Sequence, residues 1–175
     1  MLLKSITALA LLLSPLASSF PLSAPVSISA AASGKNIYLI TCLPRVKEDE
    51  TPNTTPFTAI SYFKQPITNS TDPESDKAPR GDQNVIVSSP AAAWEGVKWS
   101  VKAWRNKVFT AEIGIGAENQ EKGSLAGSAK LDTVDYVCFK DGTTAVRYKD
   151  DDLRGNCKAD YWCASLDTGK DKGGD

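Results

Sequence analysis

The stretch NCKADYWC, residues 156–163, decides the fold because it holds Cys157 and Cys163 with a candidate strand between them. Apolar and polar residues alternate from Ala159 onward, which predicts a final β-strand over 159–166. If that strand reaches back to Cys157, at ~3.3 Å per residue it holds the two Cα atoms about 20 Å apart. A disulfide needs them within about 7 Å, so a straight strand forbids a Cys157–Cys163 bond.

The pairing of the four cysteines follows from this choice. A straight final strand requires Cys157 and Cys163 to pair with Cys42 and Cys138, which gives two long-range disulfides. A tight turn at 156–160 would instead allow a local Cys157–Cys163 bond and leave Cys42 to pair with Cys138. The alternation favours the long-range pairing, and the local one stays open at this point.

The N-terminus indicates the compartment. Lys4, an apolar run over 6–13 and small residues near Ser19 are typical of a secretory signal peptide, predicted over 1–19. The run is shorter than the ~20 residues of a membrane span, so no membrane insertion is expected. We therefore expect a secreted, extracellular protein, in which an even number of cysteines predicts disulfides rather than free thiols.

The rest of the chain divides by composition. Residues 20–35 are small, unpatterned and contain proline, which predicts a flexible N-terminal arm or pro-segment. Residues 36–167 carry the strand patterns of a single β domain. Residues 168–175 are polar and rich in glycine, which predicts a disordered tail.

Composition also excludes several classes of function. The chain has no histidine, so a Ser-His-Asp triad, a Cys-His dyad and a histidine-ligated metal are all excluded. No metal site and no cofactor are expected, because the cysteines also lack metal-binding spacing. The formal net charge is −1, which provides no basic excess for nucleic acid. Carboxylate or lysine chemistry remains for an enzyme, and no spacing singles out a pair.

Short runs of β-branched and aromatic residues, separated by turn residues, predict an all-β fold. The strands are expected at 36–42, 57–63, 84–89, 97–103, 109–115, 123–131, 134–140, 143–149 and 159–166. Asp141-Gly142 predicts a hairpin between the strands on either side of it. Pro90, three alanines and Gly96 predict one short helix over 89–96. The prediction is a mainly antiparallel β-sandwich or small barrel of about eight strands, with one short helix and two disulfides.

Several motifs predict features of the surface. Asn53 and Asn69 stand in glycosylation sequons. The polar stretch 64–83 predicts a long surface loop and contains Arg80-Gly81-Asp82, which spells an adhesive tripeptide and is also ordinary turn chemistry. Trp104 falls opposite the apolar face of its strand and is a candidate surface contact. The run 150–152 of three aspartates could hold calcium, although such runs are more often solvated turns.

The leader, the four cysteines and the block YVCFKDGTT…NCKADYWC resemble the small secreted, cysteine-containing proteins of filamentous fungi, many of which are effectors. The resemblance implies an extracellular, disulfide-tied β-fold that binds host or microbial targets, and it assigns no functional residue.

The function expected is therefore that of an effector-like interaction protein without catalysis, with a protein or glycan target outside the cell and an oligomeric state left open. A glycan-binding module is the first alternative, and it would need two or more of Trp104, Trp162, Tyr62 and Tyr148 exposed on one face. A histidine-free hydrolase is the second, and it would need two carboxyl groups about 5–9.5 Å apart in a cleft.

Overall fold

The computed structural model describes residues 33–45, 55–73, 77–151 and 153–167, which form nine β-strands and two short 3-10 turns. The strands are β1 (Asn36–Pro44), β2 (Phe57–Phe63), β3 (Gln83–Ser88), β4 (Lys98–Lys102), β5 (Val108–Ile113), β6 (Leu125–Leu131), β7 (Val134–Lys140), β8 (Ala145–Lys149) and β9 (Arg154–Ser165). The turns are η2 (Trp104–Asn106) and η3 (Ala117–Asn119). The predicted all-β fold is confirmed. The predicted signal peptide and tail, and the predicted N-terminal arm up to residue 32, lie outside the described residues.

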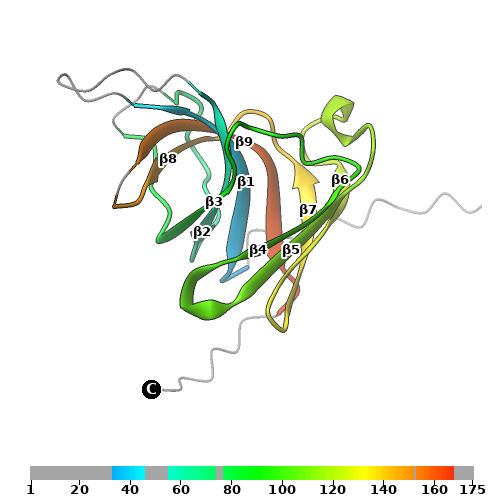
Figure 1. Ribbon diagram of the computed structural model, residues 1–175. Coiled ribbons are helices and arrows are strands. Elements are labelled where there is room, and N and C mark those ends of the chain that lie inside the picture. Colours follow the sequence, from blue (N-terminus) through cyan, green and yellow to red (C-terminus); the bar gives the residue numbers. More distant parts are fainter. Residues whose placement is uncertain (1–32, 46–54, 74–76, 152, 168–175) are drawn as a thin grey trace, which may run out of the picture.

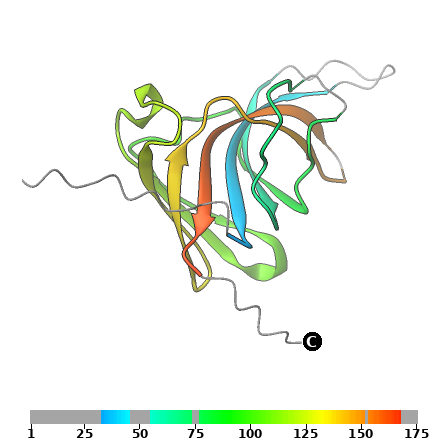
Figure 2. The same cartoon turned by 180° about the vertical axis from the view of Figure 1, so that it is seen from behind.

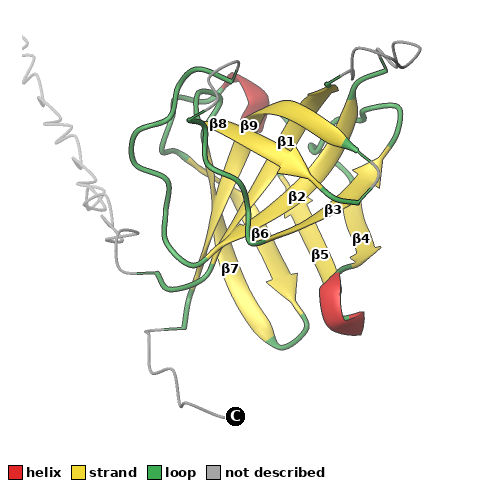
Figure 3. Cartoon of the chain, turned by 90° about the vertical axis from the view of Figure 1, so that its left-hand side faces the viewer, coloured by secondary structure: helices red, strands yellow, loops and turns green. Residues whose placement is uncertain are grey.

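The strands form one antiparallel sheet that curls into a nearly closed barrel (Figures 1 and 2). Their order is β3-β2-β1-β9-β7-β6-β5-β4, and β8 pairs with β9 beside this path. β3 and β4 are the two edges, and they are joined in sequence by residues 89–97. Figure 3 shows the strands in yellow wrapping around a common interior.

The longest strand, β9, organises the sheet. It pairs with β1 along most of its length, with β7 through its second half and with β8 through its first half. Its pairing with β1 shifts between Leu39 and Ile40, which oppose Tyr161 and Ala159, so Asp160 is an extra residue in β9. Such a β-bulge reverses which face the following side chains occupy.

The bulge divides the buried side chains of β9 between two hydrophobic cores. Tyr161 and Cys163 lie in the barrel core, while Cys157 and Ala159 lie in an outer core. The barrel core also contains Ile37, Leu39, Ile60, Trp94, Phe109, Ile113, Tyr136 and Cys138. The outer core contains Tyr38, Ile40, Cys42, Phe57, Val146 and Tyr148, with Ile67 packed against it.

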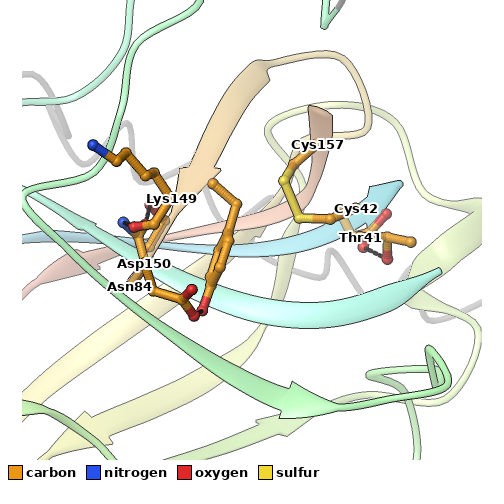
Figure 4. The surroundings of a disulfide bond; sticks show 9 residues. Thr41, Cys42, Asn84, Lys149, Asp150 and Cys157 are labelled. Atoms are coloured by element: carbon orange, nitrogen blue, oxygen red, sulfur yellow. Dashed lines mark hydrogen bonds between the residues drawn. A yellow bond between two sulfur atoms is a disulfide. The ribbon is translucent and has the colours of Figure 1, made fainter. Parts of the chain in front are cut away.

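Both disulfides are long-range, as the strand interpretation of 156–163 predicts. Cys42 is bonded to Cys157, which ties β1 to β9 in the outer core (Figure 4). Cys138 is bonded to Cys163, which ties β7 to β9 in the barrel core. The partners of each bond stand directly opposite one another in neighbouring strands. The strand also begins at Arg154, five residues before the predicted start at Ala159.

The predicted Asp141-Gly142 hairpin is wrong. β7 and β8 do not pair with each other, because both pair antiparallel with β9, one after the other. The N–H groups of Asp141 and Gly142 donate to the carbonyls of Asp160 and Ala159, at 3.0 and 2.8 Å. The Asp-Gly pair therefore bends the chain, which continues from β7 into β8 alongside β9. The hairpin in this region is formed by β8 and β9, and its turn lies between Lys149 and Arg154.

The predicted helix over 89–96 is also wrong. The N–H of Ala91 donates to the carbonyl of Pro56 at 2.7 Å, and the N–H of Ala92 donates to Thr58 Oγ1 at 2.9 Å. The same hydroxyl donates to the carbonyl of Ala92 at 3.2 Å. These backbone groups are bonded to β2 and the residue before it, so they are not available for helical hydrogen bonds.

We expect the two disulfides to contribute unequally to stability. In the loop-closure treatment, the 115-residue separation of Cys42 and Cys157 stabilises by about 5 kcal/mol, and the 25-residue separation of Cys138 and Cys163 by about 3.5 kcal/mol. Urea unfolding of Cys42→Ala/Cys157→Ala should therefore show the larger loss of unfolding free energy than Cys138→Ala/Cys163→Ala. All four sulfurs are in buried residues, so the cavity costs are matched. An equal or reversed order would contradict the prediction.

Candidate functional site

An open hollow of about 870 Å³ lies where β4 begins, β5 ends and β6 begins. We call it the apolar hollow. Three large aliphatic side chains line it and are strongly exposed: Val97 at 51%, Ile115 at 90% and Leu125 at 65%. An isolated exposed aliphatic side chain is ordinary, but three around one depression mark a candidate interaction site.

Glycines shape the apolar hollow. A Cβ on Gly127 would lie 2.2 Å from the carbonyl oxygen of Glu112, so only glycine lets β6 approach β5 this closely. Gly96 and Gly116 have φ values of 71° and 82°, in the left-handed region that favours glycine. Gly116 follows Ile115 directly, and a Cβ on Gly96 would lie 3.0 Å from Ile115 Cγ1, so both glycines make room for this strongly exposed residue.

The rim of the apolar hollow is nearly neutral in charge. Lys98 Nζ forms an ion pair with Glu112 across β4 and β5, and both side chains are mostly exposed. Such exposed pairs contribute little to stability. The hollow therefore offers aliphatic surface and one compensated charge pair.

A second, smaller cavity of about 280 Å³ opens at the same end of the barrel, lined by Thr41, residues 91–95 and Asp160. The Thr41 hydroxyl donates to Asp160 Oδ2 at 2.6 Å. The Tyr161 hydroxyl donates to Glu95 Oε1. Lys140 Nζ lies 4.7 Å from the centroid of the Tyr161 ring.

These contacts shift the pKa values of Asp160 and Tyr161. Burial raises the pKa of the Asp160 carboxyl and Glu95 raises it further, while the Thr41 hydroxyl and the nearby lysines oppose the shift without reversing it. Burial and the hydrogen bond to Glu95 also raise the pKa of the Tyr161 hydroxyl. Both carboxylates of the cavity thus have hydroxyl partners that hold them in place, which is a structural arrangement at the bulge.

Asp141 is buried, and the pKa of its carboxyl is shifted in the opposite direction from that of the half-buried Asp160. Burial alone would raise its pKa, but hydrogen bonds from Thr144, Thr143 and Lys122 hold it below its usual value. Asp141 Oδ1 accepts from the N–H groups of Thr143 and Thr144 at 3.0 and 2.9 Å. These bonds fix the bend between β7 and β8.

The Arg80-Gly81-Asp82 tripeptide runs beside β2 and is not the tip of a free loop. Arg80 forms a parallel bridge with Arg147, and the N–H of Asp82 donates to the carbonyl of Tyr62 at 2.8 Å. A Cβ on Gly81 would lie 2.1 Å from Ser61 Oγ, so packing explains this glycine. The side chains of Arg80 and Asp82 are exposed.

The stretch 64–83 was predicted to be a surface loop. The backbone of its described part also forms hydrogen bonds with β8. The N–H of Ala145 donates to the carbonyl of Ser70 at 2.7 Å, and the N–H of Arg147 donates to the carbonyl of Pro79 at 2.9 Å. The loop therefore covers the edge of β8 that faces away from β9.

The four aromatic residues proposed for a glycan-binding face are not exposed together. Trp104 is half-buried, with its ring centroid 5.7 Å from that of Tyr62, which is also half-buried. Trp162 is half-buried and donates to Asn36, and Tyr148 is buried. These rings therefore do not form the aromatic platform that sugar stacking requires.

The remaining candidate residues are distributed over the surface. Asn69 is exposed, and its glycosylation stays a prediction, while Asn53 lies outside the described residues. In the aspartate run, Asp150 accepts from the Tyr148 hydroxyl at 2.5 Å and from the N–H of Leu153 at 2.6 Å, which closes the β8–β9 turn. Within the described ranges, no group of three or more acidic or cysteine side chains could hold a metal ion.

Sequence reasoning missed both cavities. Gly114 and Gly127 stand in the sequence, but only the pairing of β5 with β6 brings them to the hollow with the exposed aliphatic side chains. The sequence around Asp160 does not indicate a bulge, because a β-bulge is defined by which residues of the partner strand stand opposite.

No described helix has the length and apolar character needed to cross a membrane. No protein-family model, curated protein or solved structure matches the chain.

The two buried carboxylates predict opposite responses to pH. Because the folded-state pKa of Asp160 is raised, its ionisation destabilises the fold above that pKa, and the cost is absent below the unfolded value of about 3.9. Asp160→Asn should therefore unfold at a higher temperature than the wild type at neutral pH, and this gain should vanish in acid.

Asp141→Asn serves as the matched variant. The folded-state pKa of Asp141 is lowered, so its stabilisation is full above about 3.9 and is lost as the pH falls through the folded-state value. This variant should be less stable than the wild type by about 2 kcal/mol at neutral pH, and the difference should close in acid. Melting curves across the pH range test both, and the same sign for both variants would contradict the assignment.

Proposed function

We propose that this chain is a secreted, effector-like interaction protein that binds a protein target of a host or microbe outside the cell, without catalysis. The observation that carries the proposal is the apolar hollow, with Val97, Ile115 and Leu125 gathered at one end of the barrel. Burying an aliphatic side chain of this size stabilises a complex by about 1.5–3 kcal/mol. Covering the hollow with another protein therefore lowers the free energy of the system.

Two features support an extracellular setting. Both disulfides are buried, which suits a protein that folds in an oxidising compartment. The predicted leader at 1–19 assigns that compartment to the secretory route.

The chemistry of the hollow favours a protein target over a glycan. Sugars are bound by aromatic rings together with several polar groups, whereas this hollow is lined by aliphatic side chains, glycine backbone and one ion pair. Aliphatic surface fits the apolar side chains of a polypeptide.

Site-specific photo-crosslinking tests the proposal. With a photoreactive residue at position 115, the mature protein should form a discrete cross-linked product with a protein in extracellular fluid of the target organism. The same residue at position 166 is the control, because Leu166 is also exposed, at 54%, and does not line the hollow. Equal labelling from both positions, or a glycan-array signal that Ile115→Ser leaves intact, would count against a protein-binding hollow.

A further inference from the structure

We propose that the free edge of β4 takes an extended acidic segment of the partner protein as an added strand, with an apolar side chain of that segment entering the apolar hollow. The inference rests on the proposed function and specifies its partner. Three features of β4 support the inference: its unpaired edge, the positive charge of its lysines, and the apolar hollow where the strand begins.

β4 is an edge with backbone groups available for pairing. It pairs with β5 on one side, and in the part of the chain that the structure describes no strand pairs with its other side. The backbone bonds at its two ends, from the N–H of Gly96 to the carbonyl of Ile113 and from the N–H of Ala103 to the carbonyl of Lys107, are both on the β5 side. An extended peptide can therefore add a main-chain ladder here, as in β-strand addition.

The charge along this edge is positive. Lys98 and Lys102 lie on β4, and Arg105 and Lys107 follow in its connection to β5. Lys98 is paired with Glu112, while the other three have no acidic partner within the described ranges. The whole chain has a formal net charge of −1, so this concentration of positive charge is local. A segment with acidic side chains complements it.

The same lysines argue against a second copy of this chain as the occupant. If two β4 strands paired antiparallel, lysines would face lysines or lie diagonal to them, and like charges across a strand pair are destabilising. Lysines on an edge often serve only to prevent such pairing. Here, however, the lysine-bearing strand also begins the apolar hollow, because Val97 and Lys98 line it.

The register of the added strand follows from the alternation in β4. Lys98, Ser100 and Lys102 are exposed, while Trp99 and Val101 pack against the barrel core. Side chains on the outer face of an added strand would lie beside the three exposed residues. The partner should therefore carry acidic residues at alternate positions. At the end near Val97 it should carry an apolar residue that enters the hollow beside Ile115, whose Cγ1 lies 3.0 Å from where a Cβ on Gly96 would be.

The test uses the mature protein and labelled peptides with glutamate at alternate positions, threonine between them and one terminal leucine. Two peptides, with the leucine at either end, cover both strand directions. Fluorescence anisotropy at low salt should show binding of at least one. Replacing glutamate by lysine, or methylating the backbone nitrogens that would pair with β4, should abolish binding, because each removes one part of the recognition.

Matched variants of the protein locate the site. Lys102→Glu should weaken binding about fivefold or more, since it replaces an attraction by a repulsion. Arg154→Glu changes the charge equally at the β8–β9 turn and should leave binding unchanged. Ile115→Ser should weaken binding, and Leu166→Ser should not. All four side chains are exposed, so the fold is expected to persist, and circular dichroism checks this.

The outcomes separate the two proposals. If neither peptide binds, or if Lys102→Glu and Arg154→Glu act alike, the strand-addition inference is overturned. If position 115 still cross-links a protein in that case, the proposed function survives with a different kind of partner. If position 115 cross-links nothing and Ile115→Ser leaves peptide binding unchanged, both proposals fail.

Discussion

The bulge at Asp160 is the constraint on which the rest of the structure depends. Cys157 and Cys163 are six residues apart, so an uninterrupted strand would place both on one face of the sheet. The extra residue places Cys163 in the barrel core and Cys157 in the outer core. β9 thereby carries one disulfide in each of two separate cores, so neither core has to stabilise the fold by itself.

The extra residue of the bulge, Asp160, is a half-buried aspartate beside the barrel. Asp160 is held by the Thr41 hydroxyl from β1, and its neighbour Tyr161 donates to Glu95 in the connection between β3 and β4. The raised pKa of Asp160 shows that burial outweighs these contacts for the ionised form. Ionised Asp160 is therefore less favourable at the bulge than the protonated form.

The sequence predicted most strand positions because alternating side chains report which face is buried. The strands 57–63 and 134–140 are observed with their predicted bounds. The hairpin at Asp141-Gly142 could not be judged locally, since the competing partner, β9, lies later in the chain. The helix over 89–96 was wrong because hydrogen bonds to Pro56 and Thr58 outweigh local propensity. The apolar hollow was not predictable, because exposure of Ile115 and Leu125 depends on how β5 and β6 meet.

The described chain enters and leaves the barrel at the same place. Asn36 stands opposite Ala164, Lys35 forms an ion pair with Asp167, and the Ser33 and Ser165 hydroxyls lie 3.0 Å apart. The apolar hollow is at the other end of the strands, where β6 begins beside the end of β7. The points where the described chain enters and leaves the barrel therefore lie at the opposite end of the strands from the apolar hollow. A partner that covers the hollow approaches the barrel from the end away from residues 33 and 167.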